Sequence, residues 1–127
     1  MKKVSVLIVD DSAVMRKIVE RSLRQAGIEI EKVMEADSGA TALGVIQQTV
    51  PDMIFSDVNM PTMDGIEFIR QLQNVESAKG VPVVMITTEG SQTRVMEALS
   101  LGAQGYIRKP FTPDQVRAQV APLLEGK

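Results

Sequence analysis

Short, strongly apolar runs alternate with segments of helical periodicity along the whole chain, and this alternation restricts the fold more than any other feature. The runs that start at residues 4, 53 and 83 are continuously apolar, which is typical of parallel strands covered on both faces. Right-handed crossovers join such strands into one sheet with helices on both sides. The alternation therefore predicts an α/β fold with a five-stranded, parallel, doubly wound sheet. The expected strands are residues 4–9, 33–36, 53–56, 83–86 and 105–108.

Two helix starts carry the pattern of a capping box. In this motif the side chain of the first residue accepts a hydrogen bond from the backbone N–H three residues later, and the side chain of that later residue accepts one from the first N–H. Asp64 and Glu67 form the first pattern, which opens a helix that we expect to reach Leu72. Thr112 and Gln115 form the second pattern, with a proline at the first helical position, where it is tolerated. These signals predict the third and the last helix of the chain.

Three further residues mark helix ends. Gly27 and Gly102 are expected just past the ends of the first and fourth helices. Pro122 lies inside the last helix, where a proline is expected to kink or end it. In the first helix, the expected sheet-facing stripe is Val14, Met15, Ile18, Val19, Ser22, Leu23 and Ala26, and the expected outward residues are Arg16, Lys17, Glu20, Arg21 and Arg24.

The composition excludes several kinds of chemistry. The 127 residues suit one domain, expected to span 1–127, and contain no cysteine and no histidine, which removes thiolate and imidazole nucleophiles, bases and metal ligands. A metal would therefore be a hard cation bound by oxygen. The net charge of −2 does not suggest a nucleic-acid partner. The apolar runs are too short to cross a membrane, and without a signal peptide we expect a cytoplasmic protein.

Charged and hydroxyl side chains follow the expected strands. Asp10 and Asp11 follow the first strand, Asp57 the third, Thr87 the fourth and Lys109 the fifth. Each aspartate taken alone could simply cap a helix or a turn. If the first and third strands are neighbours, however, the three carboxylates converge, and their repulsion favours a divalent cation such as Mg²⁺. A carboxylate beside Mg²⁺, a hydroxyl and an ammonium group predicts phosphoryl chemistry with aspartate as the nucleophile.

Four segments carry a resemblance that covers the whole chain: VDDS at 9–12, DVNMPTMDG at 57–65, TTE at 87–89 and KPF at 109–111. Their order and spacing resemble the receiver domain of two-component response regulators. Because nothing in the chain extends beyond the receiver, it is most similar to the single-domain chemotaxis members. The resemblance implies a flavodoxin-like (βα)5 fold with the strand order 2-1-3-4-5.

The resemblance also implies a Mg²⁺ site and a phosphoacceptor. Asp57 would accept the phosphoryl group from a phosphohistidine. Asp11 and Asp57 would coordinate Mg²⁺ directly, the backbone carbonyl of Asn59 would add a ligand, and Asp10 would act largely through water.

Further roles follow from the same resemblance. Thr87 and Lys109 would contact phosphoryl oxygens, and the Lys109–Pro110 peptide bond would be cis. Tyr106 would be an aromatic switch that moves inward when Thr87 is drawn to the phosphate. Asn59 and Glu89 would modulate hydrolysis of the aspartyl phosphate.

The implied protein is a signalling switch rather than an enzyme, assisting only its own phosphorylation and dephosphorylation. Its partners would be a chemotaxis-type sensor histidine kinase and an output protein, such as the flagellar motor switch, bound by a monomer at the face of the fourth helix, fifth strand and fifth helix. Thr88, where a small residue is common, would narrow access to the phosphate, and Pro122 would affect partner fit.

Other functions remain open from the sequence. A stand-alone phosphorelay receiver outside chemotaxis and a non-phosphorylated interaction module are both compatible with it. A hydrolase of the aspartyl-phosphate type is disfavoured, because such enzymes resemble one another in having a second aspartate two residues after the nucleophile. This chain has Asn59 at that position. A flavodoxin-like cofactor binder is disfavoured because the doubly acidic loop at Asp10 and Asp11 would repel phosphate.

Overall fold

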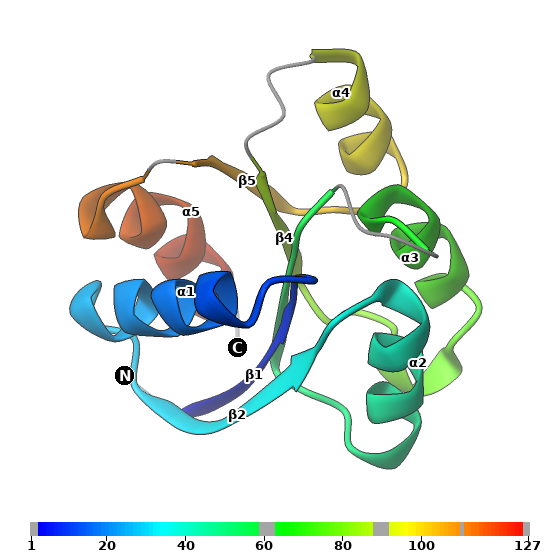
Figure 1. Cartoon of the computed structure of the whole chain (residues 1–127), viewed down its shortest axis with the longest axis horizontal. Coiled ribbons are helices and arrows are strands. Elements are labelled where there is room, and N and C mark those ends of the chain that lie inside the picture. Colours follow the sequence, from blue (N-terminus) through cyan, green and yellow to red (C-terminus); the bar gives the residue numbers. More distant parts are fainter. Residues whose placement is uncertain (1–2, 59–62, 88–91, 110, 126–127) are drawn as a thin grey trace.

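The computed structural model describes residues 3–58, 63–87, 92–109 and 111–125, and it shows one parallel sheet between two layers of helices (Figure 1). The strands are β1 (Val4–Val9), β2 (Ile30–Ala36), β3 (Met53–Ser56), β4 (Val83–Thr87) and β5 (Gly105–Arg108). Their order in the sheet is β2-β1-β3-β4-β5, and every neighbouring pair is parallel. The predicted doubly wound, flavodoxin-like fold and its strand order are therefore confirmed.

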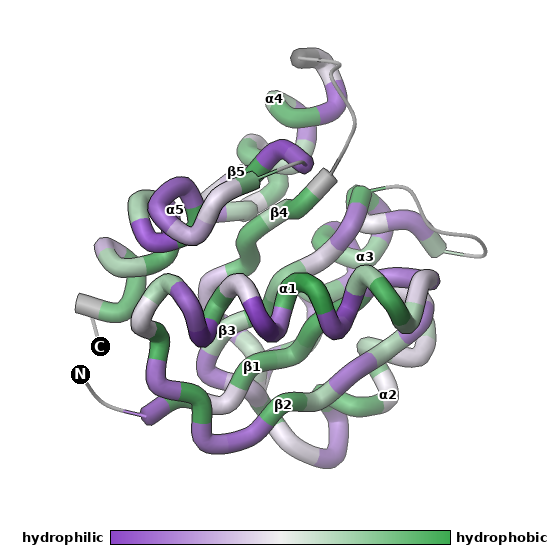
Figure 2. The backbone as a smooth tube through the Cα atoms, turned by 60° about the vertical axis from the view of Figure 1, so that its left-hand side comes forward, coloured by the Kyte–Doolittle hydropathy of each residue, from purple (hydrophilic) through white to green (hydrophobic). Residues whose placement is uncertain are grey.

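The helices are α1 (Ala13–Gln25), α2 (Gly39–Gln48), α3 (Gly65–Leu72), α4 (Gln92–Ser100) and α5 (Pro113–Glu125), with a short 3-10 helix at Glu76–Ala78. Buried residues of α1 and α5 pack against one face of the sheet, and those of α2, α3 and α4 pack against the other. The mostly apolar strands β1, β3 and β4 lie between these two cores (Figure 2). None of the helices in the described part of the chain is long and apolar enough to cross a membrane.

The helix signals act largely as predicted. The Asp64 carboxylate accepts a hydrogen bond from the Glu67 N–H at 2.9 Å and opens α3. At α5, the N–H groups and side-chain oxygens of Thr112 and Gln115 bond reciprocally at 2.9 and 3.2 Å. Gly27 follows α1 with a φ of +90°, a conformation that glycine adopts without the Cβ clash of other residues.

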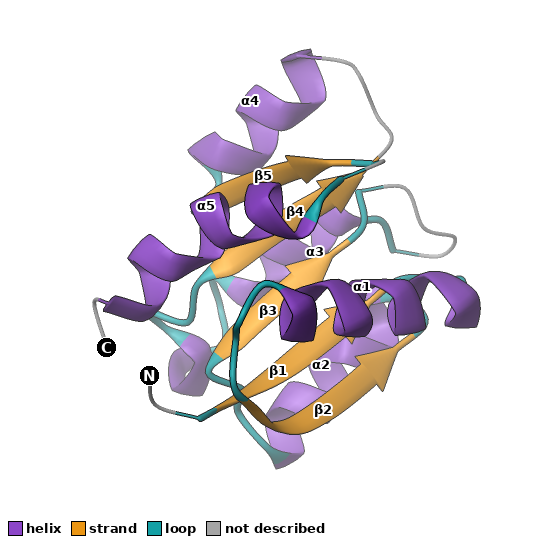
Figure 3. Cartoon of the chain, turned by 90° about the vertical axis from the view of Figure 1, so that its left-hand side faces the viewer, coloured by secondary structure: helices purple, strands orange, loops and turns teal. Residues whose placement is uncertain are grey.

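Strand β2 begins three residues earlier than the expected start at residue 33. It lies at the edge of the sheet, and among the described strands it pairs with β1 alone (Figure 3). The exposed Glu31 and Lys32 therefore cost little at this position, but they interrupt the apolar pattern from which a strand is predicted. Strand β4 extends one residue past the expected end, to Thr87.

One prediction about the helices is wrong, and for Pro122 one of the two expected effects, the end of the helix, is excluded. Val14 and Ile18 of α1 are 69% and 40% exposed, so the buried stripe of this helix is narrower than its periodicity indicates. Pro122 does not end α5, which continues to Glu125. Leu123 and Leu124 pack against the core beneath α5, and this packing holds the last turn despite the backbone bond that proline removes.

Candidate metal centre

The carboxyl ends of β1 and β3 bring three aspartates together. These strands are neighbours, with Val9 paired to Ser56, so the residues that follow them emerge side by side. The Asp57 N–H donates to the Val9 carbonyl at 2.9 Å, and this bond fixes the end of β3 against β1. One carboxylate oxygen from each of Asp10, Asp11 and Asp57 lies within 4.8 Å of the other two.

Asp10 is the most buried member of the cluster, at 3% exposure. Its Oδ1 accepts a hydrogen bond from the Ser12 N–H at 2.9 Å, and its Oδ2 lies 3.2 Å from the Lys109 ammonium group. Lys109, which follows β5, also lies 3.7 Å from Asp57 Oδ2. The ammonium group therefore compensates part of the carboxylate charge across three strand ends.

The donor set fits a hard divalent cation. Three carboxylates and one ammonium group leave two negative charges uncompensated within this cluster. All the available ligand atoms are oxygens, and Asp11 is exposed, so that side of the cluster is open to water. A small oxygen-binding cation that retains several waters suits such a set, whereas a soft metal does not.

Gly65 sets the backbone beside Asp57, a role that the sequence did not reveal. Its N–H donates to the Val58 carbonyl at 2.7 Å. A Cβ at Gly65 would lie closer to the Asp57 carbonyl oxygen than real Cβ atoms approach, and 2.8 Å from Met85 Cε. The buried Ser56 hydroxyl donates to the same Asp57 carbonyl at 2.9 Å. The sequence signal that was available, the Asp64-Gly65 dipeptide, indicated only a helix start.

Arg16 was predicted to face outward but lies against the site, with a side chain that is only 16% exposed. Its Nη1 donates to the Asp10 carbonyl at 2.6 Å, and its Nε donates to Glu35 Oε1 on β2 at 2.8 Å. Nothing in the periodicity of α1 distinguishes Arg16 from the other residues of this helix that are predicted to face outward.

The hydrogen bond from Arg16 lowers the pKa of the Glu35 carboxyl below its ordinary value of 4.5, and Lys17 adds to this effect against an opposing contribution from partial burial. A carboxyl whose pKa is lower in the folded protein stabilises the fold above its unfolded pKa, and that stability is lost as the pH falls.

We therefore expect Glu35→Gln to lower the free energy of unfolding at pH 7 by about 1 kcal/mol or less, because the ion pair is partly exposed. The difference from wild type should shrink as the pH falls below 4.5. Urea unfolding of both proteins over a pH series measures this difference in the free energy of unfolding. The control is Glu31→Gln, an exposed carboxylate of the same strand with no ion pair in the described part of the chain. A difference that stays constant down to low pH would contradict the expectation.

Of the other predicted site residues, the structure describes Thr87 and Tyr106. Thr87 ends β4, where it pairs with Arg108 of β5. Tyr106 is half-buried on β5 and packs against the core on the side of α2, α3 and α4. Its backbone N–H donates a hydrogen bond to Gln119 Oε1 at 3.4 Å. The predictions for Asn59, Thr88, Glu89 and the Lys109–Pro110 peptide bond involve residues outside the described ranges.

Comparisons with known proteins agree with this geometry. The family model for the response regulator receiver domain matches residues 6–121. The chain is 38% identical over 124 residues to chemotaxis protein CheY-3 of Vibrio cholerae, covering 98% of this chain and 94% of that protein. It is 37% identical over 120 residues to chemotaxis protein CheY of Pseudomonas aeruginosa, covering 94% and 95%. The solved structure of Vibrio cholerae CheY4 matches with a TM-score of 0.83 at 37% identity, covering 96% of this chain and 99% of that one.

Proposed function

The chain belongs to the response regulator receiver domain family, and on that premise we propose that residues 1–127 form a single-domain response regulator whose Asp57 accepts a phosphoryl group from a histidine kinase. The observation that carries the proposal is the meeting of Asp10, Asp11 and Asp57 at one sheet edge with Lys109 in ion-pair range of two of them. An acidic cluster with an adjacent ammonium group and one side open to water suits a site that handles phosphoryl groups.

In the proposed reaction, a carboxylate oxygen of Asp57 forms a bond to phosphorus as the bond from phosphorus to the donor's histidine nitrogen breaks. Mg²⁺, held by Asp10, Asp11, Asp57 and the backbone carbonyl of Asn59, would neutralise phosphoryl oxygens. Lys109 lies 3.2 Å from Asp10 and 3.7 Å from Asp57, so a small movement of its ammonium group lets it pair with an arriving phosphoryl oxygen. The chain would act on its own aspartate and on no separate substrate.

The proposed switch links this site to a binding face. Thr87 lies at the end of β4, next to β3 in the sheet, which suits a contact to a phosphoryl oxygen. Its movement toward the phosphate would favour the inward position of Tyr106, shifting an equilibrium between two states. Asn59 and Glu89 would set the rate at which the aspartyl phosphate hydrolyses.

We propose that the output is chemotaxis or motility, because relatives at 37–38% identity are chemotaxis proteins. The donor would be a chemotaxis-type histidine kinase, and the site of action would be the cytoplasm. The output partner, for example a flagellar motor switch protein, would bind a monomer at the face of α4, β5 and α5. Met96 and Leu99 of α4, 63% and 42% exposed, offer apolar surface for that contact.

Incubation with acetyl phosphate, followed by measurement of the intact mass, tests the proposal. We expect a phosphoryl adduct on the wild-type protein in Mg²⁺ and none in EDTA. Asp57→Asn should abolish the adduct, because an amide lacks the nucleophilic carboxylate. The matched control is Asp37→Asn, which removes an exposed carboxylate just beyond β2 and should leave the adduct intact. Failure of the wild type to take up phosphate, together with failure to bind fluoroberyllate, would favour an interaction module that is not phosphorylated.

A further inference from the structure

Arg16 of α1 ties the acidic loop to the edge of the sheet. Its guanidinium group bonds to both the β1–α1 loop and β2: Nη1 donates to the Asp10 carbonyl at 2.6 Å, and Nε donates to Glu35 Oε1 at 2.8 Å. The backbone N–H of Arg16 also donates to the Ser12 carbonyl at 3.0 Å, so the first turn of α1 holds the base of the side chain. The guanidinium group therefore has a fixed position and direction.

The bond to the Asp10 carbonyl bears directly on the acidic cluster. That carbonyl belongs to the peptide group that joins Asp10 to Asp11, so its orientation decides where Asp11 projects. The Asp10 side chain is separately held by the Ser12 N–H at 2.9 Å and by Lys109 at 3.2 Å. Asp11, which is exposed, depends on its backbone for its position. Arg16 thus holds the peptide bond that places the exposed carboxylate of the cluster.

Glu35 fixes the arginine in turn. Its Oε1 accepts from Arg16, and its Oε2 lies 3.4 Å from Lys17, so one carboxylate of β2 holds two neighbouring cations of α1. A guanidinium group can bond two acceptors at once in a planar fork, which the single ammonium group of a lysine does not reproduce. Groups that orient metal ligands in this way typically change metal affinity by about 10–100-fold when removed.

We propose that Arg16 is a positioning residue for the divalent cation: it orients the Asp10–Asp11 peptide so that Asp11 meets Asp10 and Asp57 around the metal. The proposal rests on the proposed function of this acidic cluster. Arg16 contacts neither the metal nor the phosphoryl group and acts through the backbone of its neighbours. Its charge by itself would have the opposite consequence, because a cation beside the cluster repels Mg²⁺.

The positioning role and the charge of Arg16 therefore predict opposite changes in Mg²⁺ affinity when Arg16 is replaced, and this difference can be tested. Mg²⁺ is titrated into the protein without any phosphodonor, and amide chemical shifts give the Kd and show in the same spectra whether the fold is intact. For Arg16→Gln we expect Mg²⁺ to bind about tenfold more weakly, although a repelling charge has been removed. Arg16→Lys keeps the positive charge but lacks the planar guanidinium group that bonds two acceptors at once. It should therefore also bind Mg²⁺ more weakly than the wild type.

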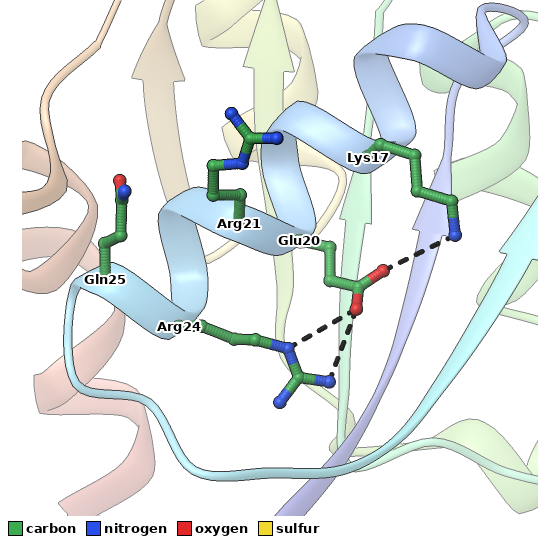
Figure 4. Close-up of a pocket in the computed structure, with 5 residues that line it drawn as sticks. All are labelled: Lys17, Glu20, Arg21, Arg24 and Gln25. Carbon is green, nitrogen blue, oxygen red and sulfur yellow. Dashed lines mark hydrogen bonds and ion pairs between the residues drawn. The ribbon is translucent and has the colours of Figure 1, made fainter.

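The matched control is Arg24→Gln. It removes the same charge from the same helix, but Arg24 pairs with Glu20 on the outer surface of α1, around a shallow hollow lined also by Lys17, Arg21 and Gln25 (Figure 4). Its Mg²⁺ affinity should equal that of the wild type. Phosphorylation of Arg16→Gln by acetyl phosphate should recover toward the wild-type rate at saturating Mg²⁺, a recovery that a direct role of Arg16 in phosphoryl transfer would not produce.

Unchanged or tighter Mg²⁺ binding by Arg16→Gln, or equal weakening in Arg24→Gln, would overturn the positioning role. So would a phosphorylation defect in Arg16→Gln that saturating Mg²⁺ fails to relieve. A wild-type protein that binds Mg²⁺ but takes up no phosphoryl group would count against the proposed function alone, because the affinities of the variants are measured without a phosphodonor.

Discussion

Replacing Lys109 with methionine is expected to slow phosphorylation by acetyl phosphate by about 100-fold or more while tightening Mg²⁺ binding. The first effect follows because the ammonium group is in place to stabilise charge on the transferred phosphoryl group, and loss of one such donor typically costs 10²–10³ in rate. The second follows because Lys109 pairs with Asp10 at 3.2 Å and Asp57 at 3.7 Å, where it competes with the metal for the same carboxylates. Stopped-flow or quenched mass measurements give the rate, and an NMR titration gives the Kd.

Stability should respond to Lys109→Met in a metal-dependent way. Without Mg²⁺, Asp10, at 3% exposure, loses its counter-charge, and an uncompensated buried charge costs about 3–5 kcal/mol when fully buried. Added Mg²⁺ should restore much of this loss, since binding to the folded state alone stabilises it.

Lys79→Met is the control for Lys109→Met, because Lys79 pairs with Glu76 at 3.2 Å on the surface, with 63% of its side chain exposed. We expect this variant to phosphorylate, bind Mg²⁺ and unfold like the wild type. If Lys109→Met did not bind Mg²⁺ more tightly than the wild type, the result would contradict the proposed competition between Lys109 and the metal. If it kept the wild-type rate of phosphorylation, Lys109 would have no part in the transfer.

The parts of the site that follow buried strands could be predicted from the sequence. Strands β1 and β3 are mostly apolar, so an aspartate directly after each strand stands out in the sequence, and parallel pairing brings the two aspartates together. The first residues of β2 could not be predicted, because an edge strand tolerates polar residues that hide its pattern. The exposure of Val14 and Ile18 likewise depends on how much of α1 the sheet and α5 cover, which no local pattern encodes.

Two residues of the site escaped prediction for a different reason. Arg16 occupies a polar position of an amphipathic helix, and only the placement of β2 beside β1 supplies Glu35 as its partner. Gly65 opens a helix without a positive φ, so its local conformation does not require glycine. Its requirement comes from the close approach of the backbone at Asp57 and Val58, just after β3, a contact between segments that only the folded chain creates.

Gly65→Ala tests that requirement. The added methyl group would press on the Asp57 carbonyl oxygen and on Met85 Cε at 2.8 Å, so the β3–α3 backbone must separate. We expect a loss of about 2–3 kcal/mol in the free energy of unfolding, as for other overpacked cores. The shift moves Asp57 itself, and a displacement of about 1 Å at a reacting group can cost 10²-fold in rate. Urea unfolding and acetyl phosphate kinetics measure the two effects.

Gly44→Ala is the matched control, and its expected sign is the opposite. Gly44 lies inside α2, where an added Cβ would meet nothing within 4 Å. Alanine is favoured over glycine inside a helix by about 0.5–1 kcal/mol, so this variant should be more stable than the wild type and phosphorylate at the same rate. Alanine at Gly65 would likewise reduce the conformational entropy of the unfolded chain, which favours folding. Stabilisation of Gly65→Ala would therefore mean that the backbone yields without displacing Asp57. Destabilisation at Gly65 alone would place its cause in the contact with the Asp57 backbone.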